Sequence, residues 1–442
     1  MTVGRGVGIC HRIAVMKTLI LFAIFAASAL PQANRFAGDV PRKPKPAFPG
    51  QTEAPPPSKP SPPVTVETIT GRLNSAWSMA FLPDGNFLVT ESAGTMRIVR
   101  PDGVVSAPLA GVPGVKVVAA QGLHDVVLDP GFAQNRLLYF CYFAPPKGEE
   151  PALWPNEFYY QNVWTKSLAE RRTIAIGTER VARARLSKDN TRLEDVEVLV
   201  EGAERRIVFA PDGKLLVTGA DRFRLYDSKY DGVEHDFTDN PDIGRNFSGR
   251  VLRINRDGSI PKDNPWLSRA TVLPETFAHG LRDPEGAAIN PATGELWVTD
   301  HGPQGGDEIN IVKPGRNYGW PDVSYGVQYD FQRTDGRKNV PVGNGKTSMP
   351  GVEEPVYFWV PDIAPSGMLF YTGDRFPAWK GNLFVGALEG QALVRLVLNG
   401  DRVAAEERLL AERKMRVRDI RQGPDGAIYL LASTGLLRIT PK

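Results

Sequence analysis

The feature that most constrains the fold is a hairpin pattern that recurs along the chain. Each copy has a short apolar run, a turn containing Pro, Asp or Gly, and a second run rich in Val, Leu, Tyr and Phe. Asp-Gly in such turns permits the positive backbone angles that a tight hairpin needs. Because the flanking runs have strand length, they favour strands over helices. Six copies are present, at residues 79–89, 126–142, 207–217, 287–299, 367–387 and 420–431.

Six hairpins spaced over the whole length predict an all-β fold, a six-bladed β-propeller with one antiparallel sheet per blade around a central channel. Residues 64–73 are expected to add an outer strand to the blade that contains residues 435–440, which closes the ring. Closure removes the exposed sheet edges that an open array would leave. A β-sandwich is the alternative, and the regular repeat of hairpins argues against it.

The N-terminal region predicts export. A positive segment at Met16-Lys17, an apolar run and the small residues Ala27-Ser28-Ala29 are typical of a signal peptide, so we expect a signal at 1–30 and a periplasmic or secreted protein. Residues 31–63 are rich in proline and predict an extended, solvated linker, followed by the propeller at 64–442. Only Cys141 follows the signal, which excludes an internal disulfide in the mature chain.

Charge and motifs exclude several classes of function. The net charge of +3 is small and no basic run alternates with aromatic residues, so nothing indicates a nucleic-acid partner. The apolar run of the signal is too short to span a membrane. Neither a haem attachment motif nor a phosphate-binding glycine loop nor a nucleophile elbow occurs.

One loop, at 299–310, has the composition of a binding site. Its glycines, among them Gly302, let backbone carbonyls approach a ligand, and Asp307 and Glu308 offer the hard oxygen donors that calcium prefers. A metal ion or polar cofactor is therefore one interpretation. The other is a turn between strands whose acids are simply solvated.

Several motifs in this order resemble one family, the soluble PQQ-dependent sugar dehydrogenases of the glucose and sorbosone dehydrogenase family. From about Asn74 to the end, the resemblance rests on the segments 122–130, 280–286, 301–310, 317–321, 361–367 and 416–419. It implies the propeller fold and the oxidation of an aldose to its lactone, with PQQ and calcium as cofactors. Its ligands would be a small-molecule sugar and an electron acceptor that the sequence does not identify.

The resemblance also implies roles for particular residues. Arg282 matches the arginine beside the reactive quinone oxygens, and Asp221 matches the acid that orients the catalytic histidine. Calcium would be held by the carbonyls of Gly302 and Pro303, with Glu308 near a second, structural calcium. The cofactor contacts that it implies are Arg282, Asp283, which replaces an asparagine, His301, Arg416, Arg418 and, beside the expected glutamine position, Gln121.

The chain departs from the family pattern at two important points. The segment that carries the family's general-base histidine reads 199–209 here, is shorter and contains no histidine, so His235 in the insertion 222–246 is the speculative substitute. Glu389 stands where the family has a lysine that faces a PQQ carboxylate, and it would repel that group. The competing hypothesis is therefore a non-catalytic ligand-binding propeller. We expect His124 to be packed in the core, and Trp320 is the aromatic residue best placed to contact a ligand.

Overall fold

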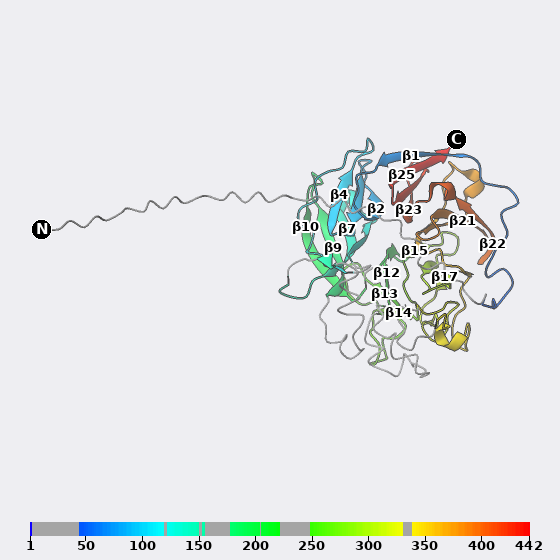
Figure 1. The fold of residues 1–442 in the computed structure, drawn as a ribbon. Helices are drawn as coiled ribbons and strands as arrows, with labels where there is room; N and C mark the ends of the chain where they lie inside the picture. Colours follow the sequence, from blue (N-terminus) through cyan, green and yellow to red (C-terminus); the bar gives the residue numbers. More distant parts are fainter. Residues whose placement is uncertain are drawn as a thin grey trace. The chain divides into compact units, whose positions relative to one another are not determined.

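The computed structural model describes Met1 and residues 44–118, 122–149, 153–154, 177–203, 205–221, 248–329 and 338–442. Residues 39–442 form one compact unit, which is described below. Its sheets form six blades around a common centre (Figure 1). The predicted all-β, six-bladed propeller is confirmed, and each of the six predicted hairpins forms the first two strands of a blade.

The first three blades follow one another in sequence. Blade 1 has three strands, β2 (Ala76–Phe81), β3 (Phe87–Glu91) and β4 (Thr95–Val99). Blade 2 contains β6 (Leu123–Leu128), β7 (Leu137–Ala144), β9 (Thr178–Leu186) and β10 (Leu193–Glu201). Blade 3 contains β11 (Ile207–Phe209), β12 (Leu215–Gly219), β13 (Arg250–Ile254) and β14 (Thr276–His279).

The second half of the ring repeats the arrangement. Blade 4 contains β15 (Gly286–Ile289), β16 (Leu296–Asp300), β17 (Asp307–Val312) and β18 (Tyr357–Trp359). Blade 5 contains β19 (Pro365–Phe370), β20 (Leu383–Ala387), β21 (Ala392–Asn399) and β22 (Arg402–Leu409). Blade 6 contains β23 (Val417–Gln422), β24 (Ile428–Ala432) and β25 (Gly435–Pro441), with β1 (Val64–Thr70) as its outermost strand.

The remaining elements are short. Strands β5 (Val117–Val118) and β8 (Leu153–Trp154) pair in parallel outside the blades. One α-helical turn and three 3-10 turns complete the described elements: α1 (Phe132–Asn135), η4 (Val342–Gly345), η5 (Pro377–Trp379) and η6 (Ala411–Arg413). Among the described residues, the structure has no helix with the length and apolar character needed to cross a membrane.

The turns form as the sequence predicts. In the β2–β3 turn, Gly85 has a φ of 84° and the Asp84 carboxylate accepts a hydrogen bond from the Asn86 amide at 3.1 Å. The β11–β12 turn repeats this geometry with Gly213, whose φ is 79°, and Asp212. A side chain that caps its own turn and a glycine in the left-handed region fix these hairpins locally.

Ring closure is visible in both pairing and packing. Strand β1 pairs antiparallel with β25 from Val64↔Pro441 onward, which confirms the predicted closing strand. The innermost strands β2, β6, β11, β15, β19 and β23 contact one another in that order, and β23 contacts β2. Six clusters of buried apolar side chains lie between adjacent blades, one at each interface. The core is therefore a ring of interfaces around the channel.

The prediction of a solvated linker is wrong for residues 44–63, here called the N-terminal strap. Gln51 is fully buried, and its carbonyl accepts a hydrogen bond from the Phe358 amide of β18 at 2.9 Å. Pro55 accepts from the Glu406 amide of β22 at 3.0 Å. Prolines remove donors, but the carbonyls of Gln51 and Pro55 still accept hydrogen bonds from the outer strands of blades 4 and 5.

Candidate functional site

The site is built around the loop that joins β16 to β17. Gly305 and Gly306 have φ values of 75° and 80°, in the left-handed region that favours glycine. A Cβ added at Gly302 would lie 2.3 Å from the Gly305 carbonyl oxygen, so the loop folds too tightly for any side chain there. The Asp307 carboxylate accepts hydrogen bonds from the amides of Gly302, Ile363 and Ala364, each at 2.8 Å. Asp307 therefore clamps the loop to blade 5 and is not a solvated acid.

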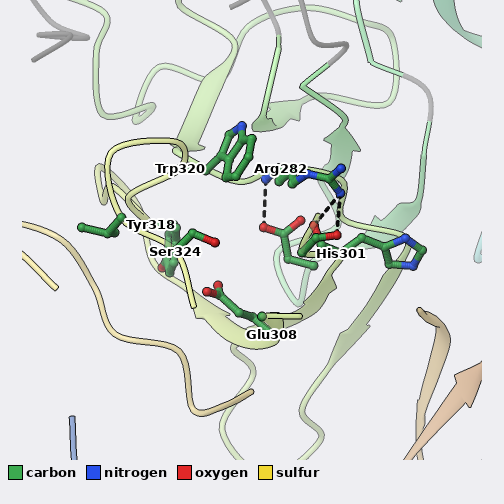
Figure 2. Close-up of a pocket in the computed structure, with 10 residues that line it drawn as sticks. Arg282, His301, Glu308, Tyr318, Trp320 and Ser324 are labelled. Atoms are coloured by element: carbon green, nitrogen blue, oxygen red, sulfur yellow. Dashed lines mark hydrogen bonds between the residues drawn. The ribbon is translucent and has the colours of Figure 1, made fainter. Parts of the chain in front are cut away.

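Arg282 lies over the carbonyls of this loop. Its guanidinium donates to the carbonyl oxygens of His301 and Gly302, both at 2.9 Å, as Figure 2 shows. The Asp300 carboxylate accepts hydrogen bonds from the amides of Arg282 at 2.8 Å and Asp283 at 2.6 Å. The arginine side chain is 5% exposed. Blade 4 thus holds Arg282 and the loop in one rigid unit.

A small pocket opens beside this unit. Figure 2 shows Trp320 and Arg282 on one side of it and Glu308 across from them. The lining residues are Arg282, Asp300, His301, Gly302, Gly306, Glu308, Tyr318, Trp320, Val323 and Ser324. The pocket therefore combines aromatic, carboxylate and guanidinium groups.

Buried acids give this region an unusual electrostatic character. Burial raises the pKa of Glu308 to about 8, and the neighbouring Asp300 adds to the shift. Burial likewise raises the pKa of Asp300 and of Asp362 to about 7. Two buried oxygens, Asp362 Oδ1 and Gln304 Oε1, have no hydrogen-bond partner among the described residues. Buried oxygens that lack a hydrogen-bond partner can serve as ligands to a hard cation such as calcium. A cation beside the buried carboxylates would also favour their charged form, which burial alone disfavours.

A second set of charged residues lies at the starts of the innermost strands. The Arg418 guanidinium pairs with the Glu285 carboxylate, and Arg205 Nε pairs with Asp283 Oδ1 at 2.8 Å. Burial alone would raise the pKa of Glu285, but Arg418 and the other neighbouring positive groups hold it well below its usual range. Arg206 bridges Asp125 at 3.3 Å and Asp419 at 3.0 Å.

Most of the predicted site residues lie together. Ligand atoms of Asp283, Glu285 and His301 lie within 4.8 Å of one another, which joins blade 4 to Arg418 through Glu285. His301 Nε2 lies 2.6 Å from the Pro365 carbonyl, and because a carbonyl only accepts, Nε2 carries the proton. Asp283 and Glu285 already pair with arginines, so the loop carbonyls are the better candidates for ligands to a bound cation.

Arg416 reaches the same region from blade 6. Its Nη1 donates to the Leu388 carbonyl at 3.1 Å and to Glu389 at 3.3 Å. The Leu388 amide in turn donates to the carbonyl of Ala364, whose own amide binds Asp307. Glu389 therefore forms an ion pair with Arg416, one of the two arginines that were predicted to face cofactor carboxylates.

Other predictions have mixed outcomes. Pro303 is buried beside Gly302. Gln121 and His235 lie outside the described residues. His124 is 1% exposed and stacks on Trp77 with ring centroids 4.7 Å apart, which confirms that it is a packed histidine.

Sequence reasoning missed Glu285, Arg205 and Arg206 as parts of the charged network. The available signal was weak, because it consisted only of two consecutive arginines before the predicted hairpin at 207–217 and of one acid before the predicted hairpin at 287–299.

The protein is a six-bladed propeller that gathers arginines, buried acids and a glycine-rich loop at the starts of its inner strands. The family described as Glucose / Sorbosone dehydrogenase matches residues 73–438. The chain belongs to that family.

Individual relatives agree with this assignment. The chain is 34% identical to the aldose sugar dehydrogenase YliI of Escherichia coli (strain K12) over 393 residues, which cover 86% of this chain and 93% of the relative. It is 26% identical to the quinoprotein glucose dehydrogenase B of Acinetobacter calcoaceticus, with coverage of 83% and 85%. The crystal structure of the soluble aldose sugar dehydrogenase from Escherichia coli in the apo form superposes with a TM-score of 0.70, at 32% identity, covering 86% of this chain and all of that one.

Proposed function

We propose that this protein oxidises an aldose sugar to its lactone with PQQ and calcium as cofactors. The observation that carries the proposal is the unit formed by Arg282 and the carbonyls of the β16–β17 loop, together with the buried oxygens Asp362 Oδ1 and Gln304 Oε1 that have no hydrogen-bond partner among the described residues. Membership of the family and the likeness to a relative named as a quinoprotein support the same cofactor.

The residues fit a calcium ion. The carbonyls of Gly302 and Pro303 are the proposed ligands, and the tight packing of the loop backbone around Gly302, where an added Cβ would lie 2.3 Å from the Gly305 carbonyl oxygen, fixes the course of the loop. Glu308 and Asp362 supply negative charge nearby, and ionisation of such buried acids becomes favourable when a cation is present. Arg282 now donates to the Gly302 carbonyl, so calcium binding there requires this guanidinium to turn toward the anionic cofactor.

The residues also fit an anionic quinone. Arg282, Arg416 and Arg418 are the proposed partners of its polar groups, with Asp283, His301 and Gln121 as further contacts. Arg416 and Arg418 are already paired with Glu389 and Glu285, so a cofactor carboxylate must exchange with those acids. When bound, PQQ would supply the two-electron oxidant and calcium the Lewis acid.

The proton acceptor must come from outside the segment that carries it in the family. No histidine occurs between β10 and β11, where the family carries its base. His235 remains the proposed substitute. The second candidate function, a non-catalytic propeller that binds a ligand in the same pocket, is favoured by this missing base and by the acids that occupy the site arginines.

The setting of the reaction is also a proposal. The proposed domains are a signal peptide at residues 1–30 and the propeller at residues 64–442. The signal peptide would direct the protein to the periplasm or outside the cell. A small-molecule sugar is the proposed substrate, and the electrons would leave to an acceptor that binds near the channel.

Two measurements test the proposal in sequence. Calorimetric titration with PQQ in the presence of calcium is expected to show one site per chain, and dye-linked oxidation of glucose is expected to follow. Arg282→Met should abolish the binding, whereas Arg180→Met, on an exposed pair of blade 2, should not. Absence of PQQ binding would overturn the enzyme proposal. Binding without turnover of any of a panel of aldoses would favour the non-catalytic propeller.

A further inference from the structure

Asp221 is tied to two walls of the pocket. It lies two residues after the end of β12 and is 4% exposed. Its carboxylate Oδ2 accepts a hydrogen bond from the Trp320 indole Nε1 at 2.6 Å. Its backbone amide donates to the Arg282 carbonyl at 2.6 Å. One residue that follows a strand of blade 3 thus contacts the side chain of Trp320 and the backbone of Arg282.

The Trp320 backbone and the Trp320 indole are held by different contacts. The Trp320 amide donates to the Gly280 carbonyl at 2.8 Å, which fixes the backbone but leaves the side-chain torsions open. The Arg282 guanidinium carbon lies 5.4 Å from the centre of the indole ring, on the side seen in Figure 2. The short hydrogen bond to Asp221 is a directional contact on the side chain itself, and it constrains the plane of the ring.

We propose that Asp221 is a positioning residue that holds the Trp320 indole as a fixed wall of the pocket, and thereby sets the affinity for a bound ligand. The family resemblance gives this acid another role, the orientation of a catalytic histidine. In this chain that histidine is missing, and the carboxylate is bonded to an indole. The inference rests on the proposed function for its probe, PQQ.

The two roles differ in what they require of residue 221. An indole N–H needs only an oxygen acceptor, which an asparagine side chain also supplies. A histidine that becomes cationic needs the negative charge, and an amide in that place gives the wrong tautomer. Asp221→Asn and Asp221→Ala therefore separate the roles.

Substitutions at Asp221 also affect Arg250, a buried cation that interacts with the Asp221 charge. It is 1% exposed, and burial lowers its pKa to about 9 while the Asp221 charge opposes the shift. Loss of the Asp221 charge will destabilise the fold around Arg250. Melting temperature is therefore recorded for every variant, and binding is compared only between folded proteins.

The binding test is a double-mutant cycle with PQQ and calcium, measured by calorimetry. Asp221→Ala is expected to weaken PQQ binding about tenfold, the scale of one hydrogen bond to a charged group. Asp221→Asn should stay within about threefold of the wild type, because the acceptor oxygen is kept. In a Trp320→Phe background, Asp221→Ala should have no further effect. Asp401→Asn, in the exposed β21–β22 turn, controls for loss of charge.

A second readout needs no ligand. The near-ultraviolet circular dichroism that Trp320 contributes, measured as wild type minus Trp320→Phe, should be lost in Asp221→Ala and kept in Asp221→Asn. If Asp221→Asn loses this signal, or if Asp221→Ala weakens PQQ equally with and without the indole N–H, the inference is overturned. If the wild type fails to bind PQQ, the proposed function falls, and the dichroism still decides the role of Asp221.

Discussion

Removal of Arg206 tests whether the charged network around the channel stabilises the ring. Its guanidinium bridges Asp125 and Asp419, donates to the Glu285 carbonyl at 2.7 Å and lies 4.1 Å from the Trp77 ring centre. Arg206→Met keeps the aliphatic stem but leaves two carboxylates, exposed by 1% and 2%, with one partner fewer. Breaking a buried ion pair in this way costs about 3–5 kcal/mol.

The lower end of that range applies here. Arg421 remains 3.0 Å from each of the same two carboxylates and compensates part of their charge. An unfolding entropy of about 2.1 cal/mol/K per residue gives roughly 0.8 kcal/mol/K over residues 64–442. A loss of about 3 kcal/mol therefore lowers the melting temperature by about 4 °C.

Differential scanning calorimetry of Arg206→Met measures this shift, and Arg180→Met serves as the matched control. Arg180 pairs with Glu201 at 2.9 Å, but both side chains are substantially exposed, and such pairs contribute about 0–1 kcal/mol. The control should therefore melt within about 1 °C of the wild type. Equal shifts in the two variants would refute the idea that the network stabilises the ring more than a surface pair does.

Three further predictions concern the site. Gly302→Ala places a Cβ 2.3 Å from a carbonyl oxygen, so the loop must move and calcium affinity, measured by calorimetry, should fall at least about tenfold. Burial raises the pKa of Asp300 to about 7 and of Glu308 to about 8, above the value of about 4 in unfolded chains. The folded, metal-free protein therefore binds more protons between about pH 4 and pH 8 and loses stability as pH rises through this window, whereas calcium should stabilise it more at pH 8 than at pH 5. Glu389→Gln frees its arginine partner and should tighten PQQ binding about two- to fivefold in calorimetric titration, as expected for a partly exposed pair.

Each of these predictions has a clear contrary result. Gly400→Ala controls for the alanine substitution, because a Cβ at this turn glycine would contact no other atom. An equal loss of calcium affinity in Gly400→Ala would contradict the proposed calcium site at the Gly302 carbonyl. A calcium-induced rise in melting temperature that is the same at pH 5 and pH 8 would contradict the buried acids as its origin. Glu412→Gln, on an exposed pair with Arg413, should leave PQQ affinity unchanged.

Local sequence signals were sufficient for the fold, because each blade begins with a self-contained hairpin. The turn at Asp84-Gly85 is fixed by its own side chain and by one glycine angle, and both can be read from adjacent residues. Closure was also predictable, since β1 has no other partner in a ring of antiparallel sheets. The N-terminal strap was not predictable from composition, because proline content does not reveal that the carbonyl of Gln51 meets the edge of β18.

Some parts of the candidate site could likewise be predicted from the sequence, and others could not. The carbonyl loop after His301 could be recognised because Gly302, Gly305 and Gly306 lie close together in the sequence, and Arg282 was recognised through the family motif. The ion pairs between Arg418 and Glu285 and between Arg205 and Asp283 join residues from different blades. Such pairs depend on how the ring brings strand starts together, and no local pattern encodes them.

Two cross-blade ion pairs, Arg416–Glu389 and Arg418–Glu285, determine how the proposed anionic cofactor would bind. In a site with unpaired arginines, a ligand carboxylate gains the full attraction of each guanidinium after desolvation. Here the carboxylate must displace Glu389 from Arg416 and Glu285 from Arg418, so its net gain is the difference between two ion pairs. Glu285 is only 5% exposed and would be left buried without its partner, whereas Glu389 is 33% exposed and can turn to water. Exchange at Arg416 is therefore the easier of the two steps, and displacement of Glu285 from Arg418 is the more costly one.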